Sequence, residues 1–362
     1  MDRVDARRLV RMRLVSQRIS ASEFTTVAEV VRWMTAMQAQ DFASAQWSVG
    51  LRLPGSTQSV VNAALIDGTI VRSWPMRGTL HFVAPEDLGW ILGLTSERLI
   101  KGAAARRAAL GLTEELLEAT RAAVIEALTG GVVLTRDEMY AVFERAGVSP
   151  GGQRGYHVLW YLSQSGTLCF GPPDEKQQTF VLFDEWIRDQ RELERDEALG
   201  EFALRYFRSH GPATIRDFAW WSSTTLTAAR IGLAIAGDSL SRFERDGESY
   251  YCSADAVRDP APDGVRALPG FDEYLLGYQD RRPQLAEEHS QAIIPGGNGV
   301  FLRTIVRDGT VVGTWKRTLS SRGVSITAQP FSSMNGRLEN GFVRAGNDYA
   351  RFLSMKAIRA PA

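Results

Sequence analysis

The stretch LSRFERDGESYYCS, residues 240–253, decides the fold class, because it has the pattern of a β-hairpin. Two short runs, 240–244 and 249–253, carry aromatic residues and flank the turn RDGE at 245–248. An Asp-Gly pair between two such runs is a strong signal for a tight hairpin turn. Apolar spacing predicts three short helices upstream, at 197–209, 214–221 and from about 224 to 236. Three helices followed by a hairpin make the winged-helix form of the helix-turn-helix.

The same order of elements is predicted twice more, nearer the N-terminus. The first copy has helices at 5–16, 26–37 and 58–67 and strands at 69–73 and 79–83. The second copy has helices at 113–128, 136–146 and 153–165 and strands at 168–171 and 179–183. Thr135 and Glu138 have the spacing of a capping box at the start of the middle helix. A single copy would be weak evidence, because this spacing also arises by chance. Three successive copies predict three tandem winged helices in an α+β fold.

After Pro260 the pattern changes. Residues 261–267 are predicted as a linker, and strand-like runs follow at 299–307, 310–316 and 324–330, with Asp308-Gly309 as a tight turn. A final helix is expected at 347–355. We therefore predict a β-rich C-terminal domain, a partly closed barrel among its possible forms. The predicted domains are residues 1–105, 106–192, 193–258 and 259–362.

Composition excludes several classes of protein. The 362 residues carry 42 Lys and Arg against 42 Asp and Glu, so the chain has no overall basic excess that would indicate a polyanion partner. A nucleic-acid binder of this composition must segregate its charge. Cys169 and Cys252 lie far apart, which excludes a disulfide scaffold and indicates a reducing compartment. No apolar run is long enough to span a bilayer, and no secretory leader is recognisable, so we expect a cytoplasmic protein. We also expect it to be a monomer.

The sequence offers no metal or cofactor site. Its four histidines are scattered and match no zinc-ligand spacing, so we predict neither a metal nor another cofactor. Both cysteines fall in apolar hairpin strands, where thiols pack as small hydrophobes rather than act as nucleophiles. Asp272 and Glu273 are adjacent carboxylates, but in a strand they would face opposite sides and would not form an acid/base pair.

Gln38-Ala39-Gln40 follows an apolar-periodic segment that is predicted to be a helix with one buried face. Two amides one residue apart cannot share a face of a continuing helix, but in an extended or turning backbone they point the same way. Such a pair is able to hold a water or a cationic centre without itself titrating. The alternative is a pair of solvated glutamines at a frayed helix end.

The first predicted hairpin has an unusual tip. Trp74 and Met76 fall between its strands, beside Arg72 and Arg77, whereas hairpin tips are normally polar. An apolar tip flanked by arginines suits insertion into a DNA groove or stacking on a base. The alternative is that the tip packs against a neighbouring unit. We predict DNA contacts from this hairpin, made by Arg72, Trp74, Met76, Arg77 and His81.

Three motifs together resemble those of the AlkZ-like family of winged-helix DNA glycosylases: MQAQD at 37–41, RSWPMRGTLH at 72–81 and LPGFDEYLLGY at 268–278. The resemblance covers nearly the whole chain. It implies three tandem winged helices, and it makes Gln38 and Gln40 the catalytic pair of the Gln-apolar-Gln branch. Ala39 is smaller than the usual aliphatic residue, which bears on the shape of the cleft. Asp41 follows directly, so a register in which it takes part stays open.

The resemblance also implies the reaction, which is excision of bulky alkylated purines from double-stranded DNA, crosslinked ones included, as repair or as self-resistance to a genotoxic natural product. An N7-alkylated guanine is positively charged and leaves readily, so the barrier lies in forming an oxocarbenium-like sugar and delivering water to it. Amide oxygens stabilise that cation and orient the water. Glutamine is a poor base, which predicts negligible activity on undamaged nucleosides. The few lysines favour a monofunctional enzyme.

Two other classes of function stay open on the sequence alone. One is a non-catalytic winged-helix DNA-binding protein such as a regulator, and the other is a scaffold that uses tandem winged helices for protein contacts. Neutral net charge argues against simple high-affinity DNA binding. Since a crosslinked base cannot swing far out of the duplex, we expect an open cleft rather than a tight base pocket.

Overall fold

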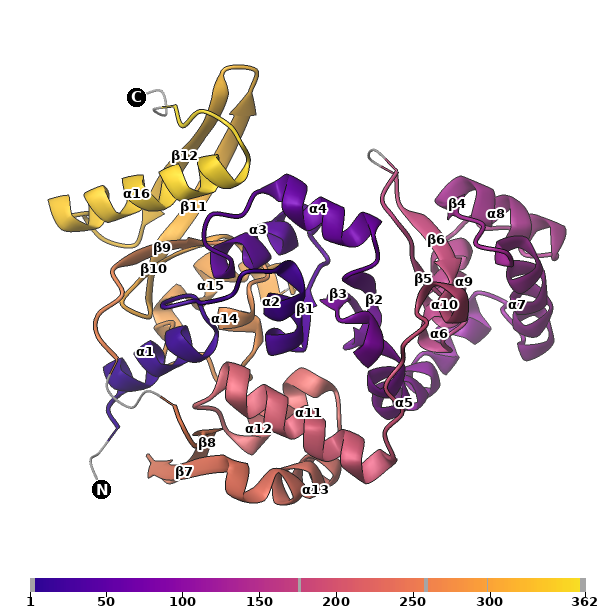
Figure 1. The fold of residues 1–362 in the computed structure, drawn as a ribbon, viewed down its shortest axis with the longest axis horizontal. Helices are drawn as coiled ribbons and strands as arrows, with labels where there is room; N and C mark the ends of the chain where they lie inside the picture. Colours follow the sequence, from indigo (N-terminus) through magenta and orange to yellow (C-terminus); the bar gives the residue numbers. More distant parts are fainter. Residues whose placement is uncertain (1–3, 175–176, 257–259, 298, 359–362) are drawn as a thin grey trace.

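The computed structural model describes residues 4–174, 177–256, 260–297 and 299–358. Its order of elements repeats three times, each time as a helix, a short extended piece, two helices and an antiparallel hairpin (Figure 1). The first repeat comprises α2 (Val27–Met34), β1 (Ala36–Gln38), α3 (Phe42–Arg52), α4 (Gln58–Ile66), β2 (Val71–Met76) and β3 (Thr79–Val83). This mixture of helices and sheets confirms the predicted α+β class.

The second and third repeats follow the same order. The second has α7 (Glu114–Leu128), β4 (Leu134–Thr135), α8 (Arg136–Arg145), α9 (Arg154–Gln164), β5 (Leu168–Phe170) and β6 (Thr179–Leu182). The third has α11 (Arg195–His210), α12 (Ile215–Ser222), α13 (Leu226–Ala236), β7 (Leu240–Arg245) and β8 (Glu248–Ser253), and its extended piece is a single bridge from Ala213 to Tyr251. The capping box of Thr135 and Glu138 is present as predicted.

Helices connect the repeats, and the remaining chain forms a further sheet. The connectors are α5 (Pro85–Gly102), α6 (Ala104–Ala109) and α10 (Phe183–Trp186). The C-terminal part has β9 (Val265–Leu268), α14 (Glu273–Leu276), α15 (Ser290–Ile293), β10 (Thr304–Arg307), β11 (Thr310–Ser320), β12 (Gly323–Pro330) and α16 (Gly336–Phe352). None of the helices in the described ranges is long and apolar enough to cross a membrane.

The strands of the described residues assemble into three sheets. A six-stranded sheet in the order β1-β3-β2-β5-β6-β4 joins the hairpins of the first two repeats through Arg72 and Phe170. The hairpin of the third repeat is a two-stranded sheet of its own. The C-terminal sheet has the order β12-β11-β10-β9, so it is open, with β12 and β9 at its edges, and is not the barrel considered from the sequence.

The N-terminal helix does not belong to the first repeat. The predicted helix at 5–16 is present as α1 (Ala6–Ser16), but its side chains Leu9, Val10 and Met12 pack with Phe243 of β7. The third helix of the first repeat is instead α3, which the sequence did not reveal. Its periodicity is hidden because polar side chains, Ser48 among them, are buried on hydrogen-bond partners.

The segment that carries the Gln-Ala-Gln motif also differs from the prediction. The helix expected at 26–37 ends at Met34, because Thr35 takes a left-handed backbone angle of φ 67°. Residues 36–38 then form β1, which pairs antiparallel with β3 so that Gln38 lies opposite His81. Gln38 therefore sits at the end of a strand and not at the end of a helix.

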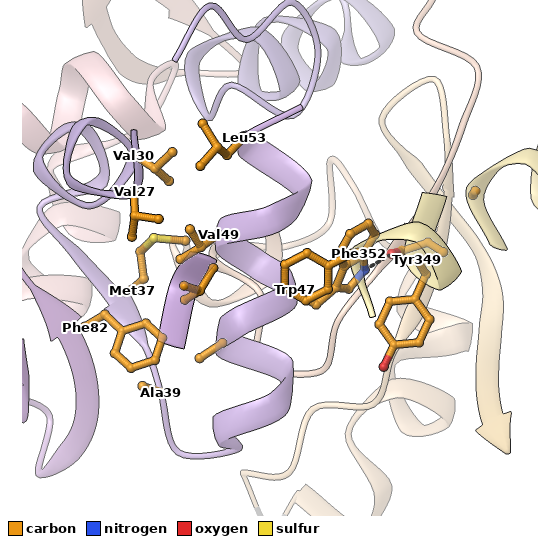
Figure 2. Close-up of a cluster of buried hydrophobic side chains, with 14 of the residues drawn as sticks. Val27, Val30, Met37, Ala39, Trp47, Val49, Leu53, Phe82, Tyr349 and Phe352 are labelled. Atoms are coloured by element: carbon orange, nitrogen blue, oxygen red, sulfur yellow. Dashed lines mark hydrogen bonds between the residues drawn. The ribbon is translucent and has the colours of Figure 1, made fainter. Parts of the chain in front are cut away.

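The C-terminal part is packed onto the first repeat. The predicted linker at 261–267 is wrong in its second half, because β9 pairs there with β10, and the final helix, α16, is longer than expected. Figure 2 shows Trp47 of α3 against Tyr349 and Phe352 of α16, with ring centroids 5.2 and 5.1 Å from it. The Trp47 indole also donates to the Ala267 carbonyl across 2.9 Å. The first repeat and the C-terminal part thus share one hydrophobic core.

Candidate active site

Alternation along β1 and its extension separates the motif into two faces. Met37 and Ala39 point into the hydrophobic core beside Phe82 (Figure 2). Side chains alternate along extended backbone, so Gln38 and Gln40 lie on the other side. Gln38 is 7% exposed, whereas Gln40 is exposed to solvent. The core position of Ala39 explains why an apolar residue stands between the two glutamines.

Arg77 holds the side chain of Gln38. The turn of the β2–β3 hairpin is Arg77-Gly78, with both residues at positive φ, 55° and 66°. From this turn Arg77 Nη2 donates to Gln38 Oε1 across 3.1 Å, and Nη1 donates to the Trp221 carbonyl across 2.8 Å. The Arg77 N–H donates to Ser223 Oγ across 3.0 Å. The hairpin of the first repeat is thereby tied to α12 of the third.

Glu273 holds the backbone of Gln38. Its Oε1 accepts from the Gln38 N–H across 3.0 Å, and its Oε2 accepts from the Trp221 indole across 2.9 Å. Arg77 Nη2 lies 3.9 Å from Oε1, and His210 Nε2 lies 3.5 Å from Oε2. Burial alone raises the pKa of Glu273, but His210 and the charge of Arg77 outweigh it and lower the pKa to about 2. The carboxylate is therefore ionised and compensates the charge of Arg77.

His81 is a neutral partner in this network. Its Nδ1 lies 2.9 Å from the Thr79 carbonyl, which only accepts, so Nδ1 carries the proton. Its Nε2 then accepts from Arg77 Nη2 across 3.0 Å. Burial, followed by the charge of Arg77, lowers the pKa of His81 to about 3. The histidine predicted to touch DNA is fully buried and supports Arg77 instead.

Gln40 and Asp41 have different surroundings. Gln40 Oε1 accepts from the Leu80 N–H across 3.3 Å. Asp41 caps α3, because its Oδ1 accepts from the Ser44 N–H across 2.9 Å, and its Oδ2 lies 3.7 Å from Arg303. The amide nitrogens of both motif glutamines have no hydrogen-bond partner within the described ranges. Both amides thus accept hydrogen bonds from the β2–β3 hairpin, whereas Asp41 caps the start of α3.

Besides His81, three more of the residues predicted to contact DNA are buried among protein atoms. Trp74 is 1% exposed and packs on Phe170 of the second repeat, with ring centroids 5.0 Å apart. Met76 is fully buried under α5. Arg72 is 5% exposed and donates from Nη2 to the Ala39 carbonyl across 2.7 Å. The exposed apolar tip expected from the sequence is wrong, because β2 runs on to Met76 and its side chains pack on neighbouring elements.

The adjacent carboxylates Asp272 and Glu273 were misread in the sequence. Asp272 and Glu273 are both buried, and they begin α14 rather than lie in a strand. Asp272 pairs with Arg52 through two hydrogen bonds of 2.9 and 3.0 Å, while Glu273 accepts a hydrogen bond from the Gln38 N–H. LPGFDEYLLGY entered the sequence-based predictions only through the family resemblance, and this motif was the signal that could have placed both carboxylates at the site. Cys169 and Cys252 are buried as expected, and the part of the chain described contains no group of three residues suited to a metal.

Comparison with known proteins identifies the family. The DNA glycosylase AlkZ-like family model matches residues 31–352. The chain is 32% identical over 312 residues to the interstrand DNA cross-link repair glycosylase of Streptomyces sahachiroi, covering 80% of this chain and 82% of the relative. It also superposes on the solved Streptomyces sahachiroi DNA glycosylase AlkZ with a TM-score of 0.83 and 26% identity, over 99% of this chain and 100% of that one. The chain therefore belongs to the AlkZ-like family of DNA glycosylases.

Proposed function

We propose that this DNA glycosylase hydrolyses the N-glycosidic bond of bulky N7-alkylated purines in double-stranded DNA, with Gln38 and Gln40 as the catalytic pair. The observation that carries the proposal is the seating of Gln38, whose backbone and side chain are each held by a separate charged partner. A relative that covers most of the chain is named for interstrand crosslink repair, which supports a bulky or crosslinked substrate.

The electrostatics of the network suit a cationic lesion. Arg77 alone would repel an N7-alkylated base and the oxocarbenium-like sugar that forms when it leaves. Ionised Glu273 lies 3.9 Å from Arg77, and His81 is neutral, so this group of side chains carries no net charge. The amide dipoles are then the local groups that orient water and face the developing charge. Each carbonyl oxygen keeps a second lone pair for this purpose, and each amide nitrogen keeps its donors.

The three helix-and-hairpin repeats are proposed to be winged helices. In each repeat the extended piece before the second helix pairs with the hairpin, at Gln38–His81, Leu134–Phe180 and Ala213–Tyr251. We retain residues 1–105, 106–192, 193–258 and 259–362 as the units, although the break at 258 falls in residues 257–259, outside the described ranges. The shared core argues that the first and last units fold together.

Excision of N7-methylguanine from a duplex tests the function. We expect the wild-type protein to produce alkali-labile abasic sites, and Gln38→Ala and Gln40→Ala each to lose most of this activity and keep a small residual rate, while binding of undamaged duplex persists. Gln291→Ala, at an exposed glutamine of α15, is the matched control. A duplex joined by an N7-linked interstrand crosslink tests the bulky-substrate part of the proposal by release of one strand.

The outcomes separate the rival functions. Binding without any excision by the wild-type protein would leave a DNA-binding regulator, and absence of both would favour a scaffold. Normal excision by the Gln38→Ala/Gln40→Ala double variant would remove the glutamines from the mechanism. We also propose a monofunctional, cytoplasmic monomer that needs no cofactor. Strand breaks that form without alkali, or a borohydride-trapped protein–DNA adduct, would contradict the monofunctional part, and light scattering checks the monomer.

A further inference from the structure

A basic hollow opens directly beside the glutamine network. It has a volume of about 750 Å³ and lies between the C-terminal end of α5 and the α12–α13 pair. Its lining includes Arg77, Arg98, Arg216, Trp220, Ser223 and Leu226. No Asp or Glu is among the described residues that line it. The hollow is therefore locally basic, although Lys and Arg balance Asp and Glu at 42 each over the chain.

The two outer arginines are available to a ligand. Arg98 Nη1 donates to the Ser223 carbonyl across 3.1 Å, which fixes the side chain over the hollow, and its other nitrogens have no partner in the described ranges. Arg216 pairs with Glu248 across 3.1 Å, with the two side chains 65% and 50% exposed. An ion pair this exposed contributes little to stability, so Arg216 can readily exchange Glu248 for another anion.

Two further features of the hollow favour an anion beside a flat group. The N-terminal end of α13 borders it, and Thr225 caps only the Ala228 N–H, so the amides of Leu226 and Thr227 have no partner among the described residues. The Trp220 ring forms part of the lining, with the guanidinium carbons of Arg77 and Arg281 at 5.5 and 5.0 Å from its centroid. The hollow thus offers fixed donors, mobile cations and an aromatic face.

The hollow is continuous with the candidate active site through one side chain. Arg77 lines it and at the same time donates to Gln38 Oε1. We propose that the hollow binds the phosphodiester backbone next to the lesion, with Arg98 and Arg216 as its phosphate contacts. The volume is too large for a single phosphate ion, and an extended polyanion matches both the charge and the open form. This inference rests on the proposed function, because it places the backbone relative to Gln38.

Salt-dependent binding of an undamaged fluorescent duplex tests the proposal. The logarithm of the binding constant falls linearly with the logarithm of salt concentration, and loss of two phosphate contacts makes this slope shallower by about 1.8. We expect this change of slope in Arg98→Ala/Arg216→Ala and about half of it in Arg216→Gln. Both variants should bind duplexes of every DNA sequence more weakly, by a similar factor. Arg351→Ala is the control, since this arginine pairs with Asp348 on α16 at the opposite edge of the molecule (Figure 1).

A second measurement separates this proposal from the function itself. In excision with protein limiting, the rate of the double variant should fall along with its DNA affinity, whereas Arg351→Ala should match the wild-type rate. If the wild-type protein excises N7-methylguanine but the variants keep its salt slope, the hollow does not hold the backbone. Saturable binding of inorganic phosphate that the variants lose, with unchanged DNA affinity, would assign a small-anion site and likewise overturn the proposal. Absence of excision by the wild-type protein would instead reject the proposed function.

Discussion

Arg77 Nη2 donates to Oε1 of Gln38 across 3.1 Å, and this bond fixes the orientation of the amide. Because a guanidinium has only donors, the oxygen must turn toward Arg77 and the NH₂ group away from it. The Gln38 N–H is fixed independently by Glu273 at 3.0 Å. Arg77 and Glu273 are therefore positioning residues for a glutamine that touches the substrate under our proposal.

A double-mutant cycle tests the positioning role of Arg77. Arg77→Lys keeps the charge but loses the planar fork, so we expect single-turnover excision to slow by roughly 10- to 100-fold, the scale of a misplaced catalytic group. In a Gln38→Ala background the same change should cost nothing more, because its effect passes through Gln38. Thermal unfolding of each variant checks the fold. Losses that multiply in the double variant would show that Arg77 acts independently of Gln38.

Asp41 is predicted to be structural. Asp41→Ala should cost about 1 kcal/mol of stability, because it removes the side-chain cap of α3. Asp41→Asn keeps a capping oxygen, so it should retain both stability and excision rate. The measurements are denaturant unfolding and single-turnover excision. A large loss of rate in Asp41→Asn with normal stability would bring Asp41 into the chemistry.

The buried pair of Arg52 and Asp272 is predicted to stabilise the fold around the site. Arg52 is fully buried, and its bonds to Asp272 join α3 to the segment that carries Glu273. Asp272→Asn leaves an uncompensated buried cation, so we expect a loss of about 3–5 kcal/mol in unfolding free energy. Arg32→Ala, which breaks the more exposed pair with Glu86, should cost less than about 1 kcal/mol. Equal losses in the two variants would be inconsistent with this account.

Excision is expected to be insensitive to pH near neutrality. The pKa of His81 is about 3 and that of Glu273 about 2, and glutamine does not titrate, so none of these groups changes charge between pH 6 and 8.5. The single-turnover rate at saturating protein should therefore vary by less than about twofold in that range. Gln40→Asp, which places a titrating carboxylate in the motif, should add an acid limb. A bell-shaped profile for the wild-type protein would reveal a general acid or base not described here.

Stability, unlike the rate, should fall in acid. His81 has an ordinary pKa of 6.5 and a folded value of about 3, so the unfolded chain binds its proton first as the pH drops. Glu273, lowered from 4.5 to about 2, acts in the same direction at lower pH. The stabilisation is complete above pH 6.5 and is lost progressively toward pH 3. Melting curves of His81→Gln should show a shallower dependence between pH 6 and 4, and an unchanged dependence would contradict the buried neutral state.

Local chemistry explains which elements could be predicted. Capping residues and tight turns act within a few positions of the chain, so the box at Thr135 and the Asp-Gly turn at 246–247 were visible in the sequence. Helix α3 was hidden, because Ser48 is buried against Asp272, which is more than two hundred residues away in the sequence. The same long-range pairing places Glu273 on Gln38, and no local pattern announces it.

By itself, the sequence determined the repeated helix-and-hairpin order and singled out the motif at 38–40, because turn chemistry, capping and side-chain periodicity are local properties. Only the tertiary structure decided that Trp74 is core rather than contact, that Arg77 donates to Gln38, and that Arg77, Arg98 and Arg216 line one hollow beside α12. Burial and charge compensation depend on which distant segments meet, and the packing of the third repeat and the segment at 268–278 against the first hairpin brings those segments together.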